Sequence, residues 1–281
     1  MSESSIGGFK IVATVGFGAN SVIYKVLDPL AGRELAIKSV KRESSADDKY
    51  IHQVLNEYEH ASSFDHPNIV RIFGLIKHRR LFHLRRCLLL MEYVDGRPLS
   101  HMDGLGIGVL VGIFAQTAEA LRYIHQMGLV HADTKPNNIM VRKDGVVKLI
   151  DFGLVGFAGK RRERVQGTMD YAAPEQLNHK TCDFKTDVYN LGATMYRVIT
   201  GHHVPSRALV HRKVRFEKFR LLPPSHLVRG VPKTLDNLVL RSCAMDRDAR
   251  PESMDEVLAG LAAVSESLAS QRKEAPAGRR R

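Results

Sequence analysis

The segment HADTKPNN, residues 131–138, gathers several residues that can do chemistry. Asp133 can accept a proton or orient a hydroxyl group, and Lys135 can neutralise a phosphate group during its transfer. Asn138 adds an amide oxygen, which together with a carboxylate suits a hard cation such as Mg²⁺. A turn with side-chain caps has a similar composition, so this segment alone does not decide between the two readings.

The residues after this segment form a predicted hairpin. Two β-branched runs, 139–141 and 146–150, flank Asp144-Gly145, which is a strong hairpin signal. The carboxylate of Asp151 follows the second run. Because a hairpin brings its two ends within about one strand spacing (~4.8 Å), we expect Asn138 and Asp151 to share a metal ion.

The N-terminal part offers groups that suit phosphate. In GFGANS, Gly16 and Gly18 let the backbone approach a ligand closely, and their N–H groups suit phosphate oxygens. No helix and no GK[ST] follows, so this is neither a Rossmann nor a Walker fingerprint. Lys38 lies in the apolar run LAIKSV and needs an anion, and Glu57 borders the buried face of a helix. Each could be a surface residue by itself, but together they predict an ion pair held against a nucleotide.

Hydrophobic periodicity places these residues on elements of two kinds. Up to about residue 95 it predicts a helix containing residues 51–61 and strands at 9–15, 22–27, 34–40, 69–76 and 87–94. From there on it predicts long helices, among them 110–124 and 187–200, which Gly128 and Gly201 terminate. We therefore expect a small lobe of strands, joined through MEYVDGRPL to a larger helical lobe.

Composition limits the class of protein. The chain has 281 residues, 44% of them apolar and 26% charged, which predicts a packed core. No signal-peptide pattern is present, and the most apolar stretch, 107–115, is too short to span a bilayer. The widely spaced Cys87, Cys182 and Cys243 predict free thiols in a reducing compartment, and we expect a cytoplasmic protein without a membrane segment.

The formal net charge of +12 arises partly from basic runs at 77–86, at 212–220 and at the C-terminus. We read these runs as solvated faces and a tail, because no nucleic-acid-binding motif accompanies them. Binding of nucleic acid to a basic scaffold stays open as a weaker alternative. The sequence gives no indication of oligomeric state.

In order and spacing, these motifs resemble those of Hanks-type (eukaryotic-like) serine/threonine protein kinases, in particular the bacterial branch. The resemblance covers residues 9–262 and includes GFGANSVIYK, MEYV, HADTKPNN, DFG, GTMDYAAPE and TDVYNLG. It implies an α+β, bilobal fold, with an N-lobe and hinge at 9–94 and a C-lobe at 95–262. A basic, disordered tail is expected at 268–281.

The resemblance also implies a role for each site residue. Asp133 would be the catalytic base, Lys135 would assist it, and Lys38 would hold phosphates with Glu57 as its partner. Asn138 and Asp151 would bind Mg²⁺, with Mn²⁺ as an alternative. In the hinge, Met91 would be the gatekeeper. The residues expected to contact ATP are Val15, Gly16, Phe17, Gly18, Ala19, Asn20, Ser21, Val22, Ile23, Lys38, Met91, Glu92 and Val94.

The implied activity is in-line transfer of the γ-phosphoryl group of ATP to serine or threonine hydroxyls of protein substrates, as in signalling. Lys135 is typical of the serine/threonine branch, and the APE segment favours a protein substrate. Two rivals stay open: a pseudokinase that acts as a nucleotide-binding scaffold, and a kinase for a small molecule. The family motifs also mark Asp187 and a pair formed by Arg250 and Glu175 as structural anchors.

Two positions depart from the family pattern. Ser21 replaces the third glycine of the glycine-rich loop, where a Cβ disfavours positive φ. Ala132 replaces an arginine that, in the family, binds a phosphate on the activation loop. That loop, residues 154–166, contains no Ser, Thr or Tyr, and Thr168 is expected to contact Asp133 and Lys135. We therefore expect a kinase that phosphorylation of this loop does not switch on.

Overall fold

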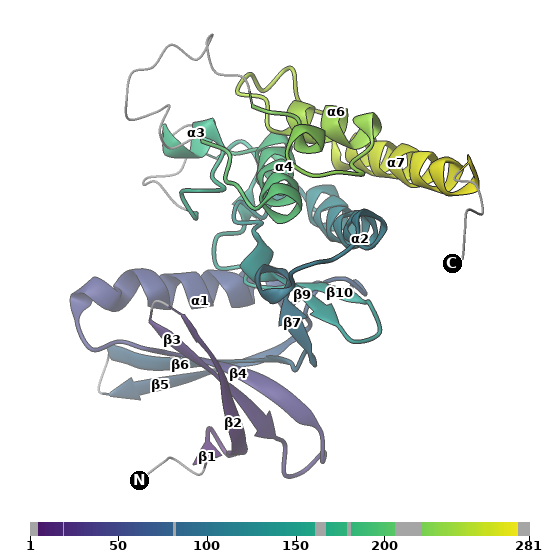
Figure 1. Ribbon diagram of the computed structural model, residues 1–281. Coiled ribbons are helices and arrows are strands. Elements are labelled where there is room, and N and C mark those ends of the chain that lie inside the picture. The colour runs from purple at the N-terminus through teal and green to yellow at the C-terminus, as the bar shows by residue number, and fades with distance from the viewer. Residues whose placement is uncertain are drawn as a thin grey trace, which may run out of the picture. The chain divides into compact units, whose positions relative to one another are not determined.

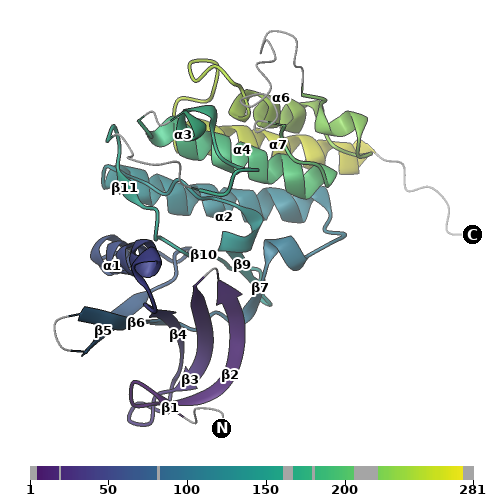
Figure 2. The same ribbon diagram turned by 90° about the vertical axis from the view of Figure 1, so that its left-hand side faces the viewer.

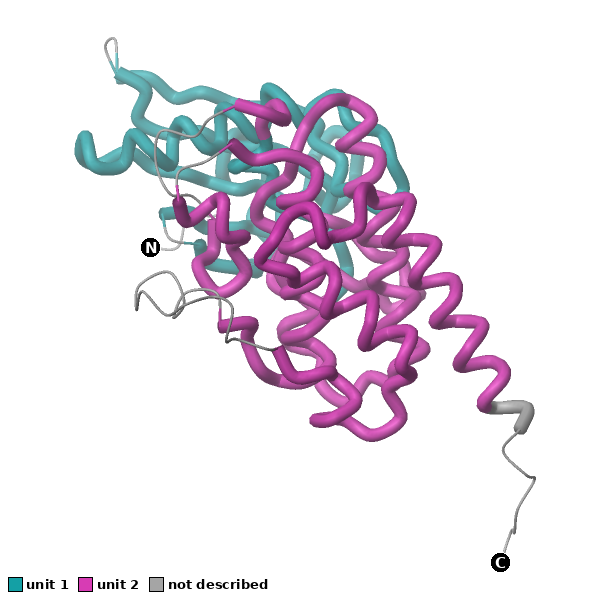
Figure 3. The backbone as a smooth tube through the Cα atoms, turned by 90° about the horizontal axis from the view of Figure 1, so that it is seen from above, with its two compact units in different colours: residues 1–96, 150–155 teal, residues 97–149, 156–281 magenta. Residues whose placement is uncertain are grey.

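The structure is a computed structural model that describes residues 5–18, 20–80, 83–160, 167–178, 181–205 and 221–274. Its contacts divide the chain into two compact units, which Figure 3 shows in teal and magenta. The smaller unit comprises residues 1–96 and 150–155, and the larger one comprises 97–149 and 156–281. The DFG segment thus packs with the smaller unit, although both of its flanks belong to the larger one.

The smaller unit contains a six-stranded antiparallel sheet with the order β1-β2-β3-β4-β6-β5 (Figure 2). Its strands are β1 (Ser5–Ile6), β2 (Phe9–Gly18), β3 (Ser21–Leu27), β4 (Glu34–Lys41), β5 (Ile72–Arg80) and β6 (His83–Glu92). An apolar cluster formed by Ile6, Val26, Leu35, Ile37 and Leu88 packs on the sheet. The helix α1 (Asp48–Ala61) packs against β4, β5 and β6 (Figure 1) and buries residues at helical spacing, namely Ile51, Val54, Glu57 and Ala61.

Two predicted strands have other bounds in the structure. Residues 69–71 precede β5, because Ile69 donates its backbone N–H to His66 in a turn, although its side chain is buried. At their other ends, β5 and β6 extend through the basic run. Most of the charged side chains of that run point to solvent, so strand geometry is compatible with them. The sequence prediction started β5 too early because Ile69 and Val70 are apolar and buried without being part of a strand. It missed the charged ends of β5 and β6 because it was based on apolar residues.

The larger unit is built around α2 (Ile107–Gln126), which packs against α4 (Phe184–Thr200) and α7 (Met254–Glu274) (Figure 2). Shorter elements complete it: β8 (Leu129–Val130), β9 (Ile139–Arg142), β10 (Val147–Leu149), β11 (Gly156–Phe157), α3 (Pro174–Leu177) and α6 (Lys233–Ser242). β7 (Gly96–Pro98) joins β9 and β10 in a three-stranded sheet. Among the described residues, single 3₁₀ turns lie at Leu99–His101, Pro136–Asn138 and Pro224–His226 in the larger unit, and at Ser45–Asp47 in the smaller one.

Local signals explain several of these elements. The predicted hairpin is confirmed: Val147 lies opposite Val141, and Gly145 turns the chain with a φ of 83°. α4 begins at Asp183, whose carboxylate accepts the N–H of Lys185, and it ends at Gly201 with a φ of 76°. One unit consists mainly of an antiparallel sheet and the other mainly of helices, which confirms the expected α+β class.

One further expectation needs correction. α7 continues to Glu274, so residues 268–274 are helical rather than a disordered tail, and Ser270 donates to the backbone oxygen of Glu266 within that helix. α2 is longer than the apolar stretch 107–115, and by length and composition alone it could cross a membrane. Half of its apolar window is buried inside the fold, however, as is usual for the core helix of a folded domain.

Candidate active site

A buried lysine with two carboxylates forms the centre of the smaller unit's site. The ammonium of Lys38, on β4, lies 2.7 Å from Glu57 Oε2 and 2.9 Å from Asp151 Oδ1. The predicted pair of Lys38 and Glu57 is therefore confirmed as an ion pair. The Asp151 side chain is 42% exposed, so a ligand can reach it.

The two carboxylates keep Lys38 charged. Burial acts to lower the pKa of Lys38, but the charges of Asp151 and Glu57 outweigh it and hold this pKa above the ordinary lysine value. Burial raises the pKa of the Glu57 carboxyl, and the ammonium of Lys38 opposes that rise. Lys38 is thus a fixed cation that can face phosphate oxygens.

α1 and the turn that follows it hold the DFG segment through hydrogen bonds and a ring contact. Glu57 Oε1 accepts the N–H of Phe152 at 3.2 Å, and Asn56 donates to the backbone oxygens of Gly153 (3.2 Å) and Val155 (2.8 Å). The buried ring of Phe152 meets Phe64 edge-on, with 5.4 Å between the centroids. Asp151, which precedes this ring, has a φ of 66°. This strained left-handed conformation is typical of functional sites.

The glycine-rich segment is largely strand in the structure. β2 continues to Gly18, which lies opposite Ser21 at the start of β3, and the ladder shifts register between Thr14 and Gly16. A Cβ on Gly18 would overlap the hydroxyl of Ser21, so that hydroxyl would have to turn away to admit any other residue there. Ser21 itself does not have a positive φ; among the described non-glycine residues only Ala132 and Asp151 do. The expected conformational cost at Ser21 is therefore absent.

The other residues expected to contact ATP lie on the same sheet. Phe17 is strongly exposed between Gly16 and Gly18, and Val22 and Ile23 pair with this part of β2. Met91, near the end of β6, is buried and lies opposite Ala36 and Ile72.

Four further described members of that set lie on the same sheet or next to its strands. Val15 is exposed on β2, Asn20 donates to the backbone oxygen of Lys41, and Glu92 ends β6. Val94 follows and accepts the N–H of Gly96. Ala19 lies outside the described residues. The structure thus places the described members of this set on β2, β3, β4 and β6, except Asn20, which lies between β2 and β3, and Val94, which follows β6.

Asp133 is the centre of a second network, in the larger unit. Its Oδ1 accepts both the N–H (2.9 Å) and the hydroxyl (3.0 Å) of Thr168. Its Oδ2 accepts from Lys135 Nζ at 2.7 Å and from Asn138 Nδ2 at 3.2 Å. Lys135 also donates to the Thr168 hydroxyl, at 2.6 Å. The predicted contact of Thr168 with Asp133 and Lys135 is therefore confirmed.

A buried carboxylate on α4, that of Asp187, fixes the backbone of the loop that carries Asp133. Asp187 accepts the N–H groups of His131 (2.8 Å) and Ala132 (2.7 Å), and His125 lies 2.9 Å from it. Burial acts to raise the pKa of Asp187. The hydrogen bond from His125, with the His131 and Ala132 groups, outweighs burial and holds this pKa below the ordinary value. The predicted structural role of Asp187 is confirmed.

Sequence reasoning missed several residues that order the same loop. Gln176 donates to the backbone oxygen of Ala132 at 2.8 Å, and Asn190 donates to Gln176. Gly167 has a φ of 98°, and a Cβ there would press against Ala132 O and Gln176 Nε2, so only glycine fits. Gln176 follows the APE motif directly, which was the one sequence signal available for it.

A buried ion pair anchors the end of this segment. Arg250 binds Glu175 with two parallel bonds of 2.8 and 3.1 Å, and both residues are almost fully buried. Thr186 also donates to Glu175. The predicted pair is confirmed, and it fixes α3 to α4 and to the loop before α7.

The comparisons with known proteins agree with these two networks. The family model described as protein kinase domain matches residues 9–260. The chain belongs to the protein kinase domain family. The expected kinase fold is thereby confirmed.

Curated bacterial serine/threonine-protein kinases resemble this kinase domain over most of its length. A probable one from Clostridium acetobutylicum is 28% identical over 95% of this chain and 41% of its own length. PknB of Mycolicibacterium smegmatis is 30% identical over 93% of this chain and 43% of its own, and PrkC of Bacillus subtilis is 29% identical over 91% and 40%. The chain thus spans about two fifths of the length of the curated relatives it matches.

The donor atoms of the kinase domain fit a hard cation. The amide nitrogen of Asn138 donates to Asp133, to its backbone oxygen (2.9 Å) and to its carboxylate, which leaves the amide oxygen on the other side. Asp151 supplies an exposed carboxylate. An amide oxygen and a carboxylate suit Mg²⁺ better than softer metals. Asn138 and Asp151 belong to different units, so their pairing at one metal ion stays a prediction.

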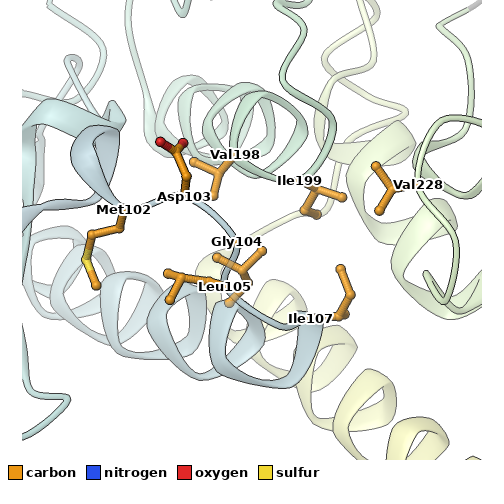
Figure 4. Close-up of a pocket in the computed structure, with 9 residues that line it drawn as sticks. Met102, Asp103, Gly104, Leu105, Ile107, Val198, Ile199 and Val228 are labelled. Carbon is orange, nitrogen blue, oxygen red and sulfur yellow. The ribbon is translucent and has the colours of Figure 1, made fainter.

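A cavity of about 240 Å³ lies elsewhere in the larger unit (Figure 4). The loop before α2, the end of α4 and Val228 line it, mostly with apolar side chains such as Met102, Leu105 and Ile199. Its lining contains none of the predicted site residues. The candidate active site therefore rests on the two networks and not on this cavity.

Proposed function

We propose that the chain is an active serine/threonine protein kinase that uses ATP with Mg²⁺. The observation that carries the proposal is the network of Asp133, Lys135 and Thr168, which joins a carboxylate, an ammonium and a hydroxyl within hydrogen-bond distance. Lys38, held between Glu57 and Asp151, supplies the cation for the nucleotide phosphates. A pseudokinase has no need to keep every one of these groups.

The mechanism follows from the chemistry of these side chains. The oxygen of a serine or threonine hydroxyl bonds to the γ-phosphorus of ATP, and the bond from that phosphorus to the β–γ bridging oxygen breaks. Asp133 orients the hydroxyl and accepts its proton, while ADP departs. Lys135 offsets the negative charge on the transferred group, and Lys38 does so on the remaining phosphates.

Mg²⁺ would be held by Asn138 and Asp151, and when bound it neutralises charge on the phosphate oxygens. Mn²⁺ has similar ligand preferences and is an alternative. The bonds from Asn138 to Asp133 support this role, because they fix the amide before any metal binds.

We further propose that activity does not depend on phosphorylation of the activation loop. Ala132 is buried in an apolar cluster with Val130 and Cys182, against which Ala158 and Phe184 pack. An arginine with a phosphate partner has no place in such a cluster.

Backbone bonds add to this attachment. β11 pairs with β8, Ala158 donates to Gly128 O, and Gly159 donates to Cys182 O at 2.8 Å. These contacts attach the start of the activation segment to the larger unit without any phosphate. We also propose a cytoplasmic setting for the domain, which the burial of Cys87, Cys182 and Cys243 as thiols supports.

Phosphate transfer tests the proposal. The wild type and the variants Asp133→Asn and Asp151→Ala are incubated with Mg-ATP and a general basic protein as acceptor, and mass spectrometry locates phosphate on both proteins. We expect transfer to serine or threonine by the wild type and its loss in both variants. ATP binding by the wild type without transfer would favour a pseudokinase instead.

A further inference from the structure

The tip of the β5–β6 hairpin carries a dense positive charge that the proposed chemistry does not use. Six exposed residues, here called the basic hairpin, provide it: Lys77, His78, Arg79, Arg80, His83 and Arg85. No acidic residue occurs between positions 77 and 86 of the sequence. The charge is thus available to an anionic partner.

Four of these residues, Lys77 to Arg80, lie on a strand at the edge of the sheet. β5 is the last strand of the six-stranded sheet, and in the described part of the chain its only strand partner is β6 (Figure 2). The backbone N–H and C=O groups along the outer side of an edge strand can accept a further strand.

The charges lie on both faces of this edge. The ladder shifts register between His78 and Arg79, where the extra residue, Arg85, lies on β6 and not on β5. Successive side chains along β5 therefore still point to opposite faces, so Lys77 and Arg79 share one face and His78 and Arg80 share the other. The charges of Lys77 and Arg79 agree with this placement, because both partly offset the rise in the pKa of Cys87 that burial causes. Charges of one face follow each other at about 6.6 Å, twice the rise per residue.

This arrangement distinguishes among anionic partners. A lipid surface or a phosphodiester backbone meets a strand from one face. An extended peptide in the plane of the sheet has side chains on both faces, at the same spacing as β5, so each of its carboxylates can meet a cation. A second copy of the basic hairpin would place like charges opposite one another and is disfavoured.

We propose that the basic hairpin docks an extended, acidic segment of a partner protein, which adds to β5 as a further strand. Main-chain hydrogen bonds supply affinity, and carboxylates at successive positions of the segment supply specificity by pairing with the lysine and arginines. None of the hairpin residues belongs to the proposed catalytic networks, so docking and phosphate transfer can be tested separately.

Fluorescence anisotropy tests the proposal with a labelled peptide in which pairs of Glu alternate with pairs of Val, titrated with the full chain. In an extended strand this sequence places carboxylates on both faces. A second peptide of the same sequence, N-methylated at each backbone nitrogen, keeps the charge and loses the strand hydrogen bonds. The hairpin variant Lys77→Glu/Arg79→Glu/Arg80→Glu is compared with Lys10→Glu/Arg229→Glu/Lys233→Glu. The second triple makes the same change in net charge at exposed positions elsewhere.

We expect the hairpin variant to weaken binding of the unmodified peptide about tenfold or more. The matched control should weaken it about twofold or less, because it leaves every charge of the basic hairpin in place. The N-methylated peptide should bind weakly to every variant, and phosphate transfer to the basic acceptor should not change. If the hairpin triple variant unfolds at a lower temperature than the wild type, the single variant Lys77→Glu replaces it. We then expect the same comparison with a smaller effect.

Three results would overturn the proposal. Equal weakening by both triple variants would mean attraction by net charge only. Undiminished binding of the N-methylated peptide would exclude strand addition. Hairpin-dependent binding to phosphatidylserine vesicles or to RNA, without binding to the peptide, would assign the surface to a different class of partner.

Discussion

At the scale of the residue, Ala132, which replaces the family's arginine, is held through both its backbone and its side chain. Its φ of 61° lies in the left-handed region, which costs a residue with a Cβ about 1 kcal/mol relative to glycine. Its methyl group is buried beside Val130 and Cys182. Its N–H and C=O are both held, by Asp187 and Gln176. The backbone is thus fixed by hydrogen bonds and the side chain by apolar contacts.

The variant Ala132→Arg should lose stability, because it forces a long cation into this apolar cluster. We expect a decrease of about 2–3 kcal/mol in the free energy of unfolding, measured by urea denaturation. Ala132→Gly is the matched control and should stay within about 1 kcal/mol of the wild type, since glycine gains at positive φ what it loses in contacts. An arginine variant as stable as the wild type would contradict the role of the cluster.

Residue types predicted the chemistry better than they predicted the surroundings. Lys38 and Glu57 are charged residues next to apolar ones in the sequence, and Asp133 lies in a polar segment. Neighbours in the sequence were therefore enough to single them out. The contact between Ala132 and Cys182 joins positions far apart in the chain, and no local pattern indicates it. The structure instead supplied that contact, and with it a physical reason for the alanine.

At the scale of the element, α1 positions the DFG segment through the amide of Asn56 as well as through Glu57. Asn56→Ala removes two hydrogen bonds to backbone oxygens and should loosen residues 151–155. We expect faster amide hydrogen exchange in that segment and a fall in the rate of phosphate transfer of about tenfold or more.

Glu59→Ala is the control for this variant, because Glu59 is exposed on the same helix. It should leave both exchange and transfer at the wild-type level. Unchanged exchange of residues 151–155 in Asn56→Ala would mean that Glu57 and Phe152 hold the segment without help from Asn56.

The pair of Glu175 and Arg250 should give acid sensitivity to the packing of α3 and α4. Burial acts to raise the pKa of Glu175, but Arg250 outweighs it, and the pKa in the folded state is lower than the ordinary value. The stabilisation is therefore complete above the pKa of an unfolded glutamate, about 4.3, and is lost as pH falls through the lower folded value.

Glu175→Gln removes this titration and leaves the Arg250 charge buried without its partner. We expect it to cost about 3 kcal/mol at neutral pH and to reduce the loss of stability on acidification from about pH 5 to about pH 3. Urea denaturation at each pH measures both effects. An equally steep acid loss in the variant would show that other carboxylates determine it.

Elements differed in how far sequence could predict them. The hairpin of β9 and β10 followed from Asp144-Gly145 and its β-branched flanks, because all of its contacts are local. The pairing of β8 with β11 involves two residues on each side and joins distant segments, so it leaves almost no periodic signal. The extension of β5 through charged residues was hidden for a different reason, because an edge strand can expose side chains on both faces.

At the scale of the whole molecule, the two networks of the candidate site belong to separate units. Lys38, Glu57 and Asp151 lie in the smaller unit, and Asp133, Lys135 and Asn138 lie in the larger one. Sequence order alone does not give this division, since the grouping of residues 150–155 with the smaller unit depends on contacts with α1. In the proposed mechanism, both networks act on one nucleotide.

The measurement that tests this account most directly is phosphate transfer by protein that has first been treated with a phosphatase. Mass spectrometry confirms removal of phosphate, and Asp133→Asn, prepared identically, sets the background. We predict that the treated wild type transfers phosphate at its original initial rate. The variant should be slower by a factor of about 10² or more.

Thr168 is the residue to follow in the same experiment. Its hydroxyl already bonds to Asp133 and Lys135, so a phosphate there would bring negative charge against the Asp133 carboxylate. A treated enzyme that is inactive, and that recovers only when phosphate appears on Thr168, would contradict the account. Full activity with Thr168 unmodified is the result that the account predicts.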